Sequence, residues 1–188
     1  MAISAPDRLY FTDSDEANAL IAHEPLALLI GFALDQQVSV QTAFSGPLKI
    51  KERLGALDAA DIASTDPDRL DAVFRERPAV HRFPGSMATR VRDLSAYVEA
   101  EYGGDAARLW READDAAELR RRIEALPGFG EMKVKALSAV LAKRFGVETA
   151  RELAPSHPTL GDVDSREALE HYQALKREWK AKMRAESS

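Results

Sequence analysis

The feature that most constrains the fold is an apolar segment with no charged residue, residues 26–34, which directly follows Pro25. Proline is well suited to the first position of a helix, because the N–H that it lacks has no intrahelical partner there. A helix that is apolar on every side belongs at the centre of a bundle. The segment is far shorter than the roughly 18 apolar residues of a membrane span. It therefore predicts a buried central helix.

The other apolar residues also recur at helical spacing, and no stretch alternates long enough to indicate a strand. We predict an all-α protein of roughly ten helices in a compact, two-lobed fold. It is expected to be one domain, 1–188, with lobes roughly 26–115 and 1–25 plus 116–188. The expected helices start near Ser14 and cover residues 26–34, 39–50, 58–63, 66–74, 86–102, 106–110, 116–125, 131–145 and 164–183. Asp164 is predicted to cap the last of them.

Composition excludes several classes of site. With 45% hydrophobic and 30% charged residues, the chain has the balance of a globular protein. It has no cysteine, which excludes disulfides, thiolate zinc sites, iron–sulfur clusters and a cysteine nucleophile. The four histidines lack the spacing of a metal site, and the N-terminus is neither basic nor amphipathic, so we expect a cytoplasmic protein. The net charge is −5, but basic residues cluster at 75–92, 133–144 and 176–184, and binding depends on local charge.

The most informative motif is the Leu-Pro-Gly-Phe-Gly segment at residues 126–130, between two amphipathic helices. Two glycines one residue apart allow a tight turn that brings N–H groups to the surface. The next helix presents unpaired N–H groups and the positive end of its dipole, which together suit a phosphate. Lys133 and Lys135 add charge toward the same backbone. The alternative is a plain glycine-containing turn between helices.

This hairpin resembles that of the helix-hairpin-helix (HhH-GPD) base-excision DNA glycosylases, the endonuclease III and alkyladenine glycosylase superfamily. The Leu-Asp-Gln-Gln-Val-Ser segment at residues 34–39 and the proline- and glycine-containing loop before the last helix also match that family. The resemblance covers about residues 26–175. Residues 77–88, together with 34–37, look like a little-characterised actinobacterial-type branch.

The resemblance implies that the protein flips a damaged base out of duplex DNA and cleaves its N-glycosidic bond. Gln36 matches the position of the residue that fills the vacancy in the duplex, and Gln37 lies beside it. Bifunctional relatives carry a lysine where this chain has Met132, so hydrolysis without strand nicking is expected. The stabilising carboxylate would be Asp162 or Asp164. Asp162 is favoured because Asp164 is already explained as a cap, although the loop 148–161 is longer than in the family pattern.

Further residues are expected to contact DNA or the flipped base. The expected DNA-binding residues are Gly128, Phe129, Gly130, Lys133, Lys135, Gln36, Gln37, His81 and Arg82. The expected base pocket contains Phe32, Asp35, Tyr97 and Trp110, and in it Asp35 would read a donor edge or attract a cationic alkylated purine. The expected partner is double-stranded DNA with a damaged base, bound by a monomer away from any membrane. No cofactor is expected beyond, at most, a monovalent cation at the hairpin.

Two alternatives to a glycosylase remain open at the level of sequence. One is a non-catalytic DNA-binding protein that keeps the hairpin but has lost the aspartate geometry. The other is a helical protein-interaction domain in which the hairpin is only a turn.

Overall fold

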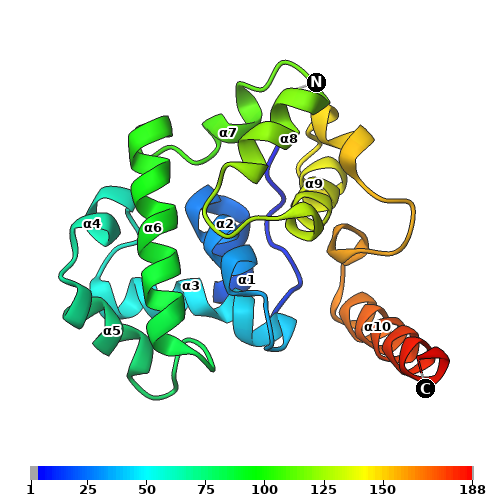
Figure 1. Cartoon of the computed structure of the whole chain (residues 1–188), viewed down its shortest axis with the longest axis horizontal. Helices are drawn as coiled ribbons and strands as arrows, with labels where there is room; N and C mark the ends of the chain where they lie inside the picture. The colour runs from blue at the N-terminus through cyan, green and yellow to red at the C-terminus, as the bar shows by residue number, and fades with distance from the viewer. Residues whose placement is uncertain (1–3, 188) are drawn as a thin grey trace.

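A computed structural model describes residues 4–187. Over that range the chain forms ten α-helices and two 3-10 helices with no strand, which confirms the predicted all-α class (Figure 1). The elements are α1 (Asp15–His23), α2 (Pro25–Leu34), α3 (Val40–Leu54), α4 (Ala59–Ser64), α5 (Pro67–Arg75), α6 (Pro84–Tyr102), α7 (Arg108–Arg111), α8 (Ala116–Glu124), α9 (Glu131–Arg144), η1 (Glu148–Leu153), η2 (Leu160–Asp162) and α10 (Arg166–Glu186).

The apolar helix α2 is the centre of the structure, as its sequence predicts. All of its residues from Leu26 to Leu34 are buried, and α1, α3 and α6 pack around it. The approach of α3 is close enough to require glycine in α2, because a Cβ atom on Gly31 would lie 2.3 Å from Cδ1 of Phe44. Phe44 in turn makes an edge-to-face contact with Phe32 at 5.1 Å between ring centroids.

Several helices begin directly after the polar residue that was expected to cap them. Ser14, Asp58 and Asp66 each accept a hydrogen bond from a first-turn N–H of the following helix. The prediction for the last helix was wrong by one residue. Its N-cap is Ser165, whose hydroxyl accepts from the N–H of Ala168 at 3.0 Å, so Asp164 lies outside the helix.

Contacts between helices divide the molecule around α2. On one side α4 and α5 pack against α6, and on the other η1 and η2 pack against α9. α1 packs against α2 and α3, whereas the predicted division grouped residues 1–25 with 116–188. α10 projects from the body (Figure 1), and every residue from 175 to 186 in it is exposed.

Within the described residues, no single helix has both the length and the apolar composition of a membrane span. α1 and α2 reach that composition only as a pair bent by 113°, and α2 is buried inside the bundle.

Candidate functional site

The hairpin between α8 and α9 presents backbone rather than side chains. Leu126 and Phe129 are buried at its base, and the Phe129 N–H donates to the Leu126 carbonyl at 3.0 Å. Gly128 has a φ of +81°, a conformation that only glycine adopts at little cost. Gly130 is the N-cap of α9 and has no side chain to cap it, so the first N–H groups of the helix face an exposed surface. This is the anion-binding geometry that the sequence predicts.

Arg90 of α6 adds a cation at the hairpin that sequence reasoning did not find. A Cβ atom on Gly128 would lie 3.2 Å from Nη1 of Arg90 and 3.3 Å from its Cδ and Cζ. The guanidinium group therefore lies directly against the hairpin backbone. Glycine at this position provides both the turn and the room for the arginine.

Lys133 points inward, away from the predicted phosphate contact. Its ammonium group donates to the carbonyl of Phe32 near the end of α2 and lies 5.8 Å from the centroid of the Phe129 ring. Burial lowers the pKa of Lys133, which nearby Asp35 opposes and Arg90 reinforces. A cation at a helix C-terminus is favourable, so Lys133 joins the hairpin to the central helix. Lys135 is exposed and lies 3.7 Å from Glu131.

Hydrogen bonds from the buried side chain of His81, which is only 2% exposed, fix the loop between α2 and α3. Its Nδ1 accepts from the N–H of Phe83 at 2.9 Å. Nε2 therefore carries the proton and donates to the carbonyls of Leu34 and Gln36, at 3.0 and 3.1 Å. Burial lowers the pKa of His81, although its backbone hydrogen bonds oppose the shift. His81 thus fixes the loop. Its ring nitrogens are already bonded, so the predicted contact of His81 with a phosphate is not available.

The two glutamines of this loop have different surroundings. Gln36 is half-buried, and its amide donates to the Ala33 carbonyl at 3.3 Å and approaches Sδ of Met87 at 3.6 Å. Gln37 is exposed and has a φ of +55°. A left-handed conformation is uncommon for a residue other than glycine and is often retained at functional sites. The loop therefore presents Gln37 to solvent from a strained position.

Asp35 lies beside Lys133, because its N–H and the Lys133 ammonium group both donate to the carbonyl of Phe32. It is the C-cap residue of α2, and burial raises its pKa, while Lys176 and Lys133 oppose the shift. In residues 4–187 its carboxylate makes no hydrogen bond and no ion pair within 4 Å. A half-buried, desolvated carboxylate without a bonded partner is costly to keep and marks a candidate functional group.

Asp162 has a capping role that was not predicted, and Asp164 lacks the capping role that was. Asp162 lies in the capping box of η2, where it accepts from the N–H of Thr159 at 2.8 Å. Its other oxygen pairs with Nζ of Lys143 at 2.6 Å. Burial alone would raise the pKa of Asp162, but the bonds from Lys143 and Thr159 hold it below its ordinary value. Asp164, predicted to be a cap, is exposed and precedes the cap Ser165.

The position of Asp162 on the fold is also informative. Its partner Lys143 follows Lys133 by ten residues in α9, which is roughly 15 Å along the helix axis. Asp162 is therefore held near the C-terminal end of α9, while the hairpin is at its N-terminal end. The structure brings Asp35, and not Asp162, beside the hairpin lysine.

The other predicted pocket residues are scattered. Phe32 and Trp110 belong to the core, where Trp110 packs 6.4 Å from Phe145. Tyr97 is half-buried against Tyr102, about two turns along α6 from Arg90. Arg82 is exposed, with its guanidinium 5.3 Å from the Phe83 ring centroid. Of the predicted pocket, only Asp35 lies with the hairpin and the glutamine loop.

In the described part of the chain, no three acidic or histidine side chains come together as a metal site. The candidate site thus consists of an exposed hairpin backbone, the cations Arg90 and Lys133, the carboxylate of Asp35 and the glutamine loop. Such an arrangement can hold an anionic backbone beside a carboxylate.

Comparison with known proteins gives the family. No curated protein and no solved structure gave a match to the chain. The profile described as HhH-GPD superfamily base excision DNA repair protein matches residues 30–188, which include the hairpin, the glutamine loop and both C-terminal aspartates. The match spans most of the chain and confirms the resemblance seen in the sequence. The protein therefore belongs to the HhH-GPD superfamily of base excision DNA repair proteins.

Proposed function

We propose that the protein is a monofunctional DNA glycosylase that hydrolyses the N-glycosidic bond of an alkylated or deaminated base flipped out of duplex DNA. The observation that carries the proposal is that Lys133, just after the hairpin, and the N–H of Asp35 both donate to the carbonyl of Phe32, which places Asp35 beside the hairpin. The exposed N–H groups of the hairpin suit a DNA phosphate. The carboxylate beside them suits the positive charge that develops when a glycosidic bond breaks.

Hydrolysis without strand cleavage is proposed because the chain has no amine at the position of the family's Schiff-base lysine. Met132 occupies that position and is 85% exposed. The nearest amine, Lys133, is directed to the carbonyl of Phe32. A covalent imine would require that lysine to leave the α2 terminus and lose its proton. Water is therefore the proposed nucleophile.

Asp35 is the carboxylate that the geometry favours for contact with the flipped nucleotide. A negative charge there stabilises either a cationic alkylated purine or the cationic sugar of the transition state. Asp162 and Asp164, the carboxylates suggested by the family pattern, remain candidates and are tested beside it. The alternative is a DNA-binding protein that has lost glycosylase activity, which the engagement of Asp162 by Lys143 and Thr159 favours.

Gln36 and Gln37 are proposed to occupy the space left by the flipped base. Gln37 is the exposed member, while Gln36 forms the base of the loop through its contacts with α2 and α6. An amide has both a donor and an acceptor, so it can pair with any unpaired base edge.

The experiment that tests this function is a panel of duplexes, each with one uracil, hypoxanthine or 3-methyladenine. Free base and abasic sites are measured separately. We expect release of at least one base, with strand cleavage only after alkali treatment. Borohydride should trap no covalent adduct, and an adduct would contradict the monofunctional mechanism. Binding without release of any base from a wider panel would instead support the non-catalytic alternative.

A further inference from the structure

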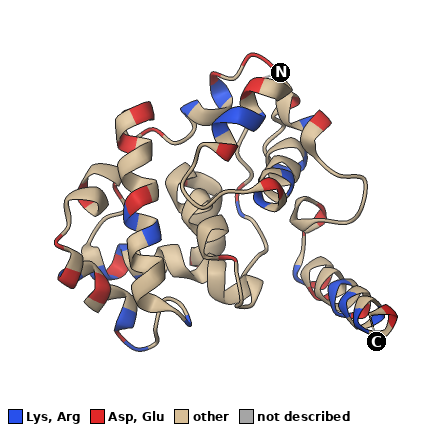
Figure 2. Ribbon diagram, in the orientation of Figure 1, with Lys and Arg blue, Asp and Glu red and all other residues tan. Residues whose placement is uncertain are grey.

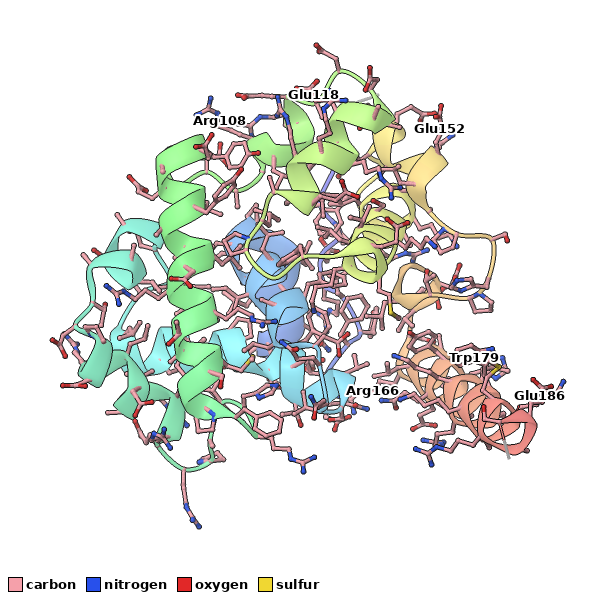
Figure 3. All side chains as sticks on the ribbon, in the orientation of Figure 1. Arg108, Glu118, Glu152, Arg166, Trp179 and Glu186 are labelled. Carbon is pink, nitrogen blue, oxygen red and sulfur yellow. The ribbon has the colours of Figure 1, made fainter. Side chains whose placement is uncertain are left out.

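The C-terminal helix α10 packs against the body only through its first half. Leu169 is buried, and Gln173 exchanges two hydrogen bonds with Gln41, in the first turn of α3, at 2.7 and 3.1 Å. One turn later Lys176 acts electrostatically on Asp35 of the candidate site. Figure 3 shows the start of the helix, at Arg166, beside the body, while Trp179 and Glu186 lie along the part that projects from it.

The side of α10 that faces the body carries basic residues in the part of the helix that projects beyond the body. Residues four apart in a helix differ by only about 40° in direction, so Lys180 and then Arg184 continue the line of Lys176. Glu170 and Glu178 lie on other sides of the helix. Figure 2 shows positive residues repeated along this helix among acidic ones. The regular spacing separates them into faces.

We propose that the cationic face of α10, formed by Lys176, Lys180 and Arg184, binds the phosphate backbone of duplex DNA next to the candidate site. The proposal rests on the DNA binding that membership of the family implies, and it adds a contact surface outside the hairpin. Two observations support it. The face carries the charge opposite to that of DNA, and the Gln173–Gln41 hydrogen bonds hold the start of this face beside the loop that contains Asp35, on which Lys176 acts.

An apolar stripe runs beside the cationic face and suggests a competing occupant. Trp179 and Met183 are 61% and 45% exposed, and Leu175 is 36% exposed. These side chains would suit a protein surface or a second copy of the chain. We favour DNA because the line from Leu169 through Lys176 to Lys180 points to the same side as the candidate site, whereas Leu175 and Trp179 lie to one side of that line.

The test compares Lys180→Gln with Lys182→Gln. Lys182 is also an exposed lysine of the same helix, but it points about 160° away from Lys180 and lies near Glu178. Affinity for an undamaged duplex is measured by fluorescence anisotropy over a range of salt concentrations. Each phosphate contact contributes about 0.9 to the slope of log K against log[salt].

We expect Lys180→Gln to weaken binding roughly 3- to 10-fold near 0.1 M salt and to reduce the slope by about 1. Lys182→Gln should leave both close to the parent values. Equal effects of the two variants would overturn the inference while leaving the hairpin interface intact. Self-association in sedimentation that Trp179→Ser abolishes, with no change of the salt slope in Lys180→Gln, would also overturn it in favour of a second copy. If the parent protein binds no duplex at all, the proposed function fails as well.

Discussion

Two segments of this molecule each contain an aspartate, an exposed one at residue 162 and a half-buried one at residue 35, and the two carboxylates have opposite surroundings. Asp162, after α9, has both carboxylate oxygens engaged, one in a capping box and the other in an ion pair with Lys143. Asp35, after α2, is desolvated and lies in electrostatic range of two lysines, but within residues 4–187 its carboxylate makes no hydrogen bond. The first arrangement is what a chain uses to fix a turn. The second opposes folding and is retained where a charge has another task.

The thermodynamic consequences have opposite signs. The folded-state pKa of Asp162 is lowered, so Asp162 contributes stability above its ordinary pKa, and that stability is lost as the pH falls through the folded value. The folded-state pKa of Asp35 is raised. Its favourable contribution is present only below its ordinary pKa and disappears as the pH rises through the folded value. At neutral pH the charge on Asp35 therefore destabilises the protein.

The largest expected effect is on catalysis by Asp35→Asn. We expect single-turnover base release to fall by about 100-fold or more, the usual consequence of removing one preorganised charge-stabilising group. Thermal stability at neutral pH should stay equal or rise, because the uncompensated charge is gone. Asp164→Asn is the control for an exposed aspartate. If Asp164→Asn or Asp162→Asn abolishes release while Asp35→Asn does not, the catalytic carboxylate is at the C-terminal end of α9 and not at Asp35.

The second prediction concerns the support of the Asp35 loop. His81→Ala should destabilise the protein by about 2 kcal/mol, because the Leu34 and Gln36 carbonyls lose their buried donor. Chemical denaturation measures this loss. Base release should fall too, since the loop that holds Asp35 and Gln37 loses its anchor. A stable variant with full activity would show that the loop is fixed without His81.

The third prediction concerns the carboxylate with a structural role. Asp162→Asn should lower the free energy of unfolding by about 1 kcal/mol through the weakened cap, and the exposed ion pair should add less than that. Base release should stay within about threefold of the parent rate, an effect far below that of a catalytic group. A cycle with Lys143→Gln separates the ion pair from the cap. A large loss of activity with normal stability would instead indicate that Asp162 is a catalytic residue.

These differences were only partly predictable from the sequence. The hairpin was predicted because consecutive residues encode it: glycine allows the positive φ at 128, and Leu126 and Phe129 anchor the turn. The central helix was predicted because its residues are apolar on every side, so no face of it is suited to solvent. The cap of α10 was misplaced by one residue because Asp164 and Ser165 both have cap-forming side chains at suitable spacing.

The environment of the site was not predictable in the same way. Arg90 approaches Gly128 from another helix, and Lys176 approaches Asp35 from the far end of the chain. No local pattern reports such contacts, because they arise from the packing of α6 and α10. The inward direction of Lys133 likewise depends on the position of the Phe32 carbonyl, and a helical pattern gives only the face of the helix.

The smallest expected effect is a change in pH dependence that tests how Asp35 works. If the ionised form is required, base release falls at low pH with a midpoint above the ordinary pKa of an aspartate, because burial raises it. Lys176 opposes that shift, so Lys176→Gln should move the acid limb of the saturated rate to higher pH. Lys180→Gln changes the same charge on the same face, but the lysines that act on Asp35 are Lys176 and Lys133, so this variant should leave the limb in place. Burial lowers the pKa of His81, and Arg90, not Lys176, is the charged group that acts on it. A rate that instead rises as the pH falls would mean that Asp35 acts as a neutral acid that donates a proton to the departing base.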